Sequence, residues 1–243
     1  IGLNTQLNSN LLIENNECMR QSSMSINMLN SADVEIKNNL LDNRDQLGGG
    51  MMINGCQYPI KIAENKIMNK RWGVSLNYNF SSVEELQVIN NYIEVGADAN
   101  YSYTQFGVRL SLYEALKVLN NTIVIAGYSV ETSRALWLLS PIGVSHIKNN
   151  ILVNNASGRS IFYSGSVAIE SDYNDLYSTG GILVTWNSSD YSSLAEYQSV
   201  RGQDLNSLNV NPSFLLNSDP HLNDFIINNA GTPLAEVTTD IDG

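Results

Sequence analysis

Short stretches of alternating apolar and polar residues recur along most of the chain, and nearly every one ends at an asparagine corner. Three clear examples are Leu11-Leu-Ile-Glu-Asn-Asn16, Val34-Glu-Ile-Lys-Asn-Asn39 and Leu116-Lys-Val-Leu-Asn-Asn121. The third positions of the stretches align as Ile13, Ile36, Ile62, Val88, Val118, Ile147 and Ser171, at spacings of 23, 26, 26, 30, 29 and 24 residues. A nearly regular period in this range predicts a solenoid, in which each repeat stacks on its neighbours.

Each repeat is predicted to hold more than one strand. Alternation with period two indicates a strand with one buried face. A second apolar stretch precedes most corners by about ten residues, as in Gly73-Val-Ser-Leu-Asn77 and Gly107-Val-Arg-Leu-Ser111. One coil is therefore predicted to run strand, turn, strand, asparagine corner, short strand and loop.

Asparagine is heavily used, with 33 residues in the chain of 243. Asparagine tolerates the left-handed conformation that a tight corner requires. Its amide can also hydrogen-bond to the same residue of the next coil and so form a ladder. We expect both roles at the corners, which are Asn15/Asn16, Asn38/Asn39, Asn65, Asn90/Asn91, Asn120/Asn121 and Asn149/Asn150.

The repeat resembles that of single-stranded right-handed parallel β-helix proteins of the pectate-lyase-like superfamily, over roughly residues 1–176. The resemblance implies an all-β fold of about seven coils. A leucine-rich repeat does not fit, because its L-x-x-L-x-L pattern and any helix between the units are missing. The resemblance is to a structural repeat and by itself assigns no activity.

The pattern changes after Leu176. The run from Ser192 to Val200 places Leu194, Tyr197 and Val200 at helical spacing, which predicts a short helix. We therefore divide the chain into β-helix coils at 1–178 and a last coil with an acidic C-terminal cap at 179–243.

The tail resembles the closing segment of secreted β-helix proteins of the Bacteroidetes. The matching parts are Trp186, Ser193 to Asp204, Asn211 to Phe214, Pro220 to Leu222, Ile227 to Pro233 and Asp240 to Gly243. Residues Phe225 to Ile227 depart from the family's usual Ser-Pro-Ala-Ile. The resemblance implies a secreted or cell-surface location, and we expect a monomeric fragment of a larger protein.

Charge is unevenly distributed. The formal net charge is −11, with 13 acidic and 12 basic side chains in residues 1–169, but 11 acidic residues and one base, Arg201, in residues 170–243. An acidic end disfavours nucleic acid and anionic membranes as partners. No apolar run is long enough to predict membrane insertion. Cys18 and Cys56 are predicted to be reduced core thiols, because their coils lie too far apart for a disulfide.

No cofactor is predicted, although two acidic segments offer oxygen ligands for a possible Ca²⁺ ion. One is the loop with Asp42 and Asp45 before a glycine run, and the other holds Glu170, Asp172 and Asp175 beside Asn174. In both cases the sequence favours a solvated loop or turn without a metal.

Catalysis is not favoured by the face on which β-helix enzymes usually bind their substrates. Alternation predicts that this face carries no Asp or Glu, whereas glycoside hydrolysis needs two carboxylates. Arg109 is the one basic residue predicted there, and neither His146 nor His221 has a partner in the sequence. The chain is therefore predicted to bind without catalysis; an enzyme would be a polysaccharide lyase or a glycoside hydrolase.

The same face suggests polysaccharide binding. Amides bind sugar hydroxyls, and aromatic side chains cover the apolar patches of sugars. The candidate binding residues are Asn77, Arg109, Trp137 and Phe162 on the face, with Tyr101 and Tyr103 in the longest loop. A carboxylate cluster from Glu94 and Asp98 facing Arg109 would favour a lyase or hydrolase instead. A plain amide face with Trp137 buried would favour a structural or adhesin stalk segment.

Overall fold

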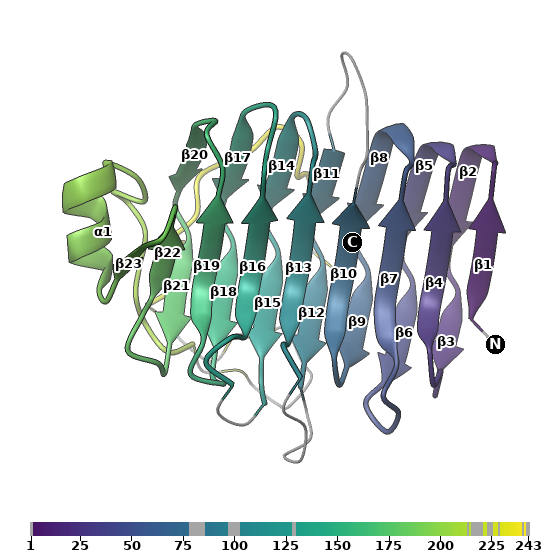
Figure 1. Cartoon of the computed structure of the whole chain (residues 1–243), viewed down its shortest axis with the longest axis horizontal. Coiled ribbons are helices and arrows are strands. Elements are labelled where there is room, and N and C mark those ends of the chain that lie inside the picture. Colours follow the sequence, from purple (N-terminus) through teal and green to yellow (C-terminus); the bar gives the residue numbers. More distant parts are fainter. Residues whose placement is uncertain are drawn as a thin grey trace.

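The chain folds as a parallel β-solenoid built from a repeating triplet of strands, as a computed structural model shows (Figure 1). The structure describes residues 2–77, 86–96, 103–127, 130–212, 214, 221–222, 226–227, 229–239 and 241. In Figure 1 the first strand of each triplet runs upward in front, the chain returns behind, and the next triplet lies to the left. The solenoid is therefore right-handed.

Three sheets run along the solenoid, and each takes one strand from every coil. Sheet A contains β1 (Leu3–Gln6), β4 (Met24–Leu29), β7 (Gly49–Asn54), β10 (Trp72–Asn77), β13 (Phe106–Ser111), β16 (Arg134–Leu139), β19 (Arg159–Ser164), β22 (Val184–Trp186) and β23 (Ser189–Tyr191). Sheet B contains β2 (Ser9–Glu14), β5 (Ala32–Lys37), β8 (Gln57–Ala63), β11 (Leu86–Ile89), β14 (Leu116–Leu119), β17 (Ser145–Lys148) and β20 (Ile169–Asp172). Sheet C contains β3 (Glu17–Met19), β6 (Leu40–Asn43), β9 (Lys66–Asn69), β12 (Tyr92–Val95), β15 (Thr122–Ile125), β18 (Ile151–Asn154) and β21 (Asp175–Ser178). We number the triplets coil 1 (β1–β3) to coil 7 (β19–β21).

The predicted register is confirmed. The aligned positions Ile13, Ile36, Ile62, Val88, Val118, Ile147 and Ser171 are direct neighbours in sheet B. Except for Ser171, which is buried but polar, their side chains and the matching rows of sheets A and C form one continuous hydrophobic core. Each fully buried aliphatic side chain contributes roughly 1.5–3 kcal/mol, so these stacked rows supply most of the stability.

The asparagine corners divide their two predicted roles between neighbouring residues. The first residue of each pair adopts the left-handed conformation, as at Asn90 (φ 59°) and Asn120 (φ 53°). The second residue turns inward and carries the ladder. Where only one asparagine is present it is the ladder residue, Asn65 or Asn174, while Glu64 and Tyr173 take the left-handed position.

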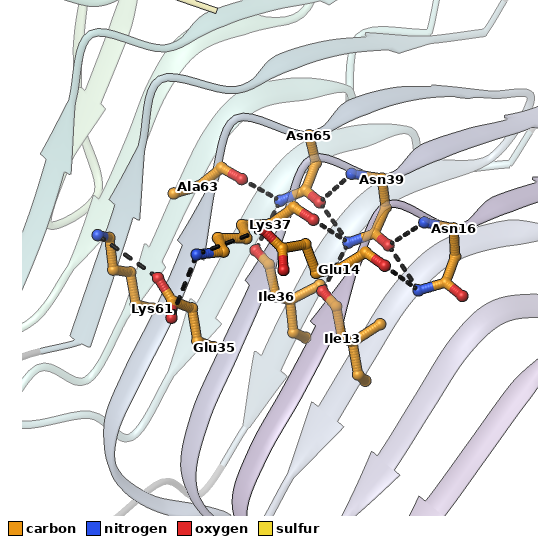
Figure 2. A network of polar contacts seen from close by, with 10 residues as sticks. All are labelled: Ile13, Glu14, Asn16, Glu35, Ile36, Lys37, Asn39, Lys61, Ala63 and Asn65. Carbon is orange, nitrogen blue, oxygen red and sulfur yellow. Dashed lines mark hydrogen bonds and ion pairs between the residues drawn. The ribbon is translucent and has the colours of Figure 1, made fainter. Parts of the chain in front are cut away.

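The buried ladder links seven coils through side-chain amides, and its first three rungs are drawn in Figure 2. Each Nδ2 donates to the Oδ1 of the next rung at 2.9–3.0 Å. The same amides donate to main-chain carbonyls of their own and the preceding coil, as Asn65 does to Ala63 and Ile36. The rungs are Asn16, Asn39, Asn65, Asn91, Asn121, Asn150 and Asn174.

The C-terminal end of the solenoid is closed by a cap. The strand β23 pairs antiparallel with β22, and the helix α1 (Leu194–Arg201) follows, with Ser193 as its N-cap and Gly202 in the left-handed conformation. The predicted helix is confirmed, although Val200 is exposed. The fully buried Asp204 ends the ladder, because its Oδ1 accepts from the Asn174 amide at 2.9 Å and from the Ser207 hydroxyl at 2.6 Å.

Asp204 makes the stability of the cap dependent on pH. Burial raises the pKa of its carboxyl, against the hydrogen bonds that lower it. A carboxyl whose pKa is higher in the folded state stabilises fully below its unfolded pKa of about 4, and that stability is lost as the pH rises through the folded pKa. We expect Asp204→Asn, which keeps the acceptor, to become increasingly more stable than the natural chain between pH 4 and pH 7 in urea unfolding.

The matched control is Asp33→Asn, which makes the same substitution at an exposed position of β5. A difference between Asp204→Asn and the natural chain that stays constant over this range would contradict the assignment.

After the cap, the tail returns along the solenoid toward its N-terminal end (Figure 1, yellow). Residues 229–239, which we call the strap, lie over the corner between sheets B and C. Asn149 in coil 6 donates to the Thr232 carbonyl at 2.7 Å and accepts from its N–H at 2.9 Å. Lys117 in coil 5 pairs with Glu236 at 2.7 Å, and Asn90 in coil 4 donates to the Thr239 carbonyl at 3.0 Å.

Candidate binding face on sheet A

The outer face of sheet A holds more side chains than strict alternation predicts. From β4 to β19 in sheet A, the second residue of each strand is small and lies against the interior; a Cβ on Gly107 would come within 2.1 Å of Ile123. The strand is locally irregular at this residue, so its first and fourth residues both lie on the outer face. Ser25, which strict alternation with Ile26 and Met28 would place on the outer face, is instead buried and accepts a hydrogen bond from Asn43.

This irregularity adds a row of outward residues that the sequence analysis missed. They are Trp72, Phe106, Arg134 and Arg159, the first residues of β10, β13, β16 and β19. The recurring small second residue, which is Gly73 in β10 and Gly107 in β13, was the signal that could have revealed them. A shift of one position transfers a side chain to the other face of a strand.

Three of the predicted binding residues lie side by side. Arg109, Trp137 and Phe162 are register neighbours on β13, β16 and β19, and all three are half-buried with their side chains on the outer face. Asn77 joins them, because its Oδ1 accepts from Arg109 Nη1 at 3.0 Å and its Nδ2 donates to Asn54 at 2.8 Å. The predicted outward register of Trp137 is confirmed.

Four aromatic rings form a strip across coils 4 to 7. Trp72 stacks on Phe106 with centroids 5.9 Å apart and planes at 12°. Phe106 meets Trp137 edge-on at 5.9 Å, and Trp137 meets Phe162 edge-on at 6.1 Å. Rings in these geometries attract one another beyond their buried area, so the strip is a rigid platform.

Arginines lie on this platform. The Arg109 guanidinium carbon is 5.0 Å from the centroid of Trp137, and that of Arg134 is 4.3 Å from the same ring and 4.5 Å from Phe162. Cations in this position are held by the ring's negative face. The ring of Trp137 therefore supports two guanidinium groups, and is less open to a stacking sugar than the sequence suggested.

The positive charges of Arg109 and Arg134 are not neutralised by a carboxylate of the described chain. Arg159 donates to Thr185 at 2.8 Å and has Asp190 at 3.8 Å, whereas Arg109 and Arg134 have no carboxylate partner within the described chain. Burial and the neighbouring Arg159 lower the pKa of Arg134 to about 10, so it stays charged at neutral pH. The Nε atoms of Arg109 and Arg134 and the Trp137 indole nitrogen are buried without a partner among the described residues.

The residues predicted in and near the longest loop do not join this cluster in the described structure. Tyr103 is 49% exposed, with the Arg71 guanidinium carbon 4.9 Å from its ring centroid. Tyr101 lies outside the described residues, as does Asp98. Glu94 does not face Arg109, because it lies on β12 in sheet C and accepts from the Tyr92 hydroxyl at 2.8 Å.

The acidic segments considered for Ca²⁺ are engaged elsewhere. Asp42 pairs with Arg44 at 2.7 Å, which lowers the pKa of that carboxyl. Asp172 accepts from the main chain and side chain of Asn206, and Glu170 lies 3.0 Å from His146. The described part of the chain holds no group of three potential metal ligands.

Both cysteines are free thiols, as predicted, with Cys56 buried and Cys18 half-buried. Among the described residues, no helix has the length and hydropathy needed to span a membrane.

Comparison with family models, curated proteins and solved structures finds no match to this chain.

Proposed function

We propose that the outer face of sheet A binds an acidic polysaccharide without cleaving it. The observation that carries the proposal is the pair Arg109 and Arg134, both stacked on Trp137 and both without a carboxylate partner in the described chain. Guanidinium groups bind carboxylates and sulfates through paired N–H donors, and stacking on a ring orients them in advance. The resemblance of the tail to secreted proteins supports a secreted or cell-surface location, where such polymers occur.

Binding is favoured over catalysis by what surrounds these arginines. Asp190 accepts from the Thr185 hydroxyl at 2.6 Å and lies 3.8 Å from Arg159. No other carboxylate forms a hydrogen bond or ion pair with Arg109, Arg134 or Arg159 among the described residues, so these contacts hold no pair of carboxylates such as glycoside hydrolysis needs.

On coils 1 to 4, the contacts among the outer side chains of sheet A favour a structural role. Their outward amides bond to each other, Asn27 to Asn4 at 3.1 Å and Asn77 to Asn54 at 2.8 Å. This is the plain amide face expected of a stalk segment. We therefore propose the binding surface on coils 4 to 7 and a structural role for coils 1 to 3.

The test is isothermal titration calorimetry with acidic polysaccharides (polygalacturonate, alginate and a sulfated galactan) and with neutral dextran. We expect Arg109→Ala and Arg134→Ala each to raise the Kd for an acidic polymer about tenfold or more, since a charge-assisted hydrogen bond contributes about 1.5–3 kcal/mol. Added salt should weaken binding by the natural chain.

The matched control is Lys61→Ala, which removes a half-exposed cation from the outer face of sheet B and should leave the Kd unchanged. Failure of every acidic polymer to bind would overturn the proposal. So would binding that is insensitive to both arginine substitutions.

A further inference from the structure

A pocket of about 240 Å³ opens where sheet C begins, next to the strap and away from sheet A. Its walls include Asn120 from the corner of coil 5, Tyr92, Thr122 and Ile151 from the first positions of β12, β15 and β18, and His221 and Ile241 from the tail. The solenoid therefore forms most of the pocket wall, and the tail contributes to the rest.

The corner asparagines on either side of Asn120 are occupied. The Asn149 amide donates to the Thr232 carbonyl and accepts from the Thr232 N–H, and Asn90 donates to the Thr239 carbonyl. These corners are two coils apart, about 10 Å, whereas seven extended residues span about 23 Å. The strap therefore has slack between its two attachments and makes a turn there, with Val237 N–H donating to the Leu234 carbonyl.

The middle corner is left without the contact that its neighbours make. Asn120 has the same left-handed backbone as Asn90 and Asn149, but its Oδ1 is buried with no hydrogen-bond partner in the described chain. Thr122, two residues further on, is half-buried and lines the pocket, and its hydroxyl makes no hydrogen bond among the described residues. A buried polar group left unpaired is destabilising, so a partner at this position would be stabilising.

The remaining walls determine what such a partner can be. Tyr92, Ile151 and Ile241 provide apolar surface, and the Tyr92 hydroxyl is already bonded to Glu94. The described lining residues include one histidine, His221, and no Asp, Glu, Lys or Arg. Amide and hydroxyl groups beside apolar walls suit a neutral molecule that has several hydroxyls and one apolar face.

We infer that this pocket binds a single neutral sugar ring, with Asn120 and Thr122 as the recognising residues. The volume is below the roughly 300–1,000 Å³ of sites for drug-sized ligands, which limits the ligand to about one ring. The inference does not depend on the proposed function of sheet A, because it uses different residues on a different sheet.

The test is a titration of the complete ¹⁵N-labelled chain, followed by nuclear magnetic resonance, with the methyl α-pyranosides of glucose, galactose and mannose. We expect at least one of them to shift the Asn120 side-chain amide signal saturably. Thr122→Val, which removes only the hydroxyl, should weaken that sugar at least tenfold. Asn120→Gly keeps the left-handed tolerance of the residue, removes the Oδ1 acceptor and should weaken it similarly.

Asn38→Gly makes the same change at the exposed corner of coil 2 and should leave the affinity unchanged. A matching disaccharide distinguishes the two sources of the ring: tighter binding would indicate a unit within a polymer, and equal binding a free sugar. Absence of any saturable shift with the three sugars would overturn the inference. Affinity that survives both pocket substitutions would also overturn it.

Discussion

Replacing Val88 by aspartate is expected to unfold neighbouring coils together and to lower the free energy of unfolding by about 5 kcal/mol or more. Val88 is fully buried between Ile62 and Val118 in sheet B. The substitution removes an aliphatic contact on both sides and places an unpaired carboxylate in the core. Because each coil of a solenoid buries its face only against its neighbours, the damage should extend beyond coil 4.

Urea unfolding followed by circular dichroism measures this effect, and Gln87→Asp is the matched control. Gln87 is the preceding residue of the same strand, lies on the outer face, and has Lys61 and Lys117 as its register neighbours. An aspartate there should change stability by less than about 0.5 kcal/mol. Equal effects of the two substitutions would contradict the inward register of sheet B.

The second large effect is expected at the asparagine ladder. Asn121 is buried, and its Nδ2 donates to the carbonyls of Val88 and Leu119 and to the Oδ1 of Asn150, at 2.8–3.0 Å. Its own Oδ1 accepts from the main-chain N–H and the amide of Asn91. Asn121→Ala leaves several of these groups buried and unpaired at about 1–3 kcal/mol each, so we expect a loss of about 4 kcal/mol.

Asn16→Ala tests the same chemistry at the first rung, where the side chain is exposed and water can replace the lost bonds. We expect that substitution to cost no more than about 1 kcal/mol in urea unfolding. A comparable loss at Asn16 and Asn121 would mean that the ladder contributes little through its burial.

Much of the fold was predictable because its signals are local. The aligned row from Ile13 to Ser171 appears in the structure with the same partners, since alternation marks the buried face and the asparagine corners mark the turns. The candidate site was only half predictable. Arg109, Trp137 and Phe162 follow alternation, whereas Trp72 and Arg134 do not, because a small inward residue interrupts the period of their strands.

The sequence by itself determined the coil period, the inward rows of sheet B, the asparagine corners and the uneven charge, all of which depend on the local periodicity of the chain. Only the tertiary structure decided which asparagine of each pair forms the ladder, which arginines lie over Trp137, and where the tail returns. The ladder and the stacking of Arg109 on Trp137 are contacts between coils that are 23–30 residues apart in the sequence, and the tail contacts join residues 83–149 apart. They depend on how side chains of successive coils are offset when the coils stack, which no single repeat encodes.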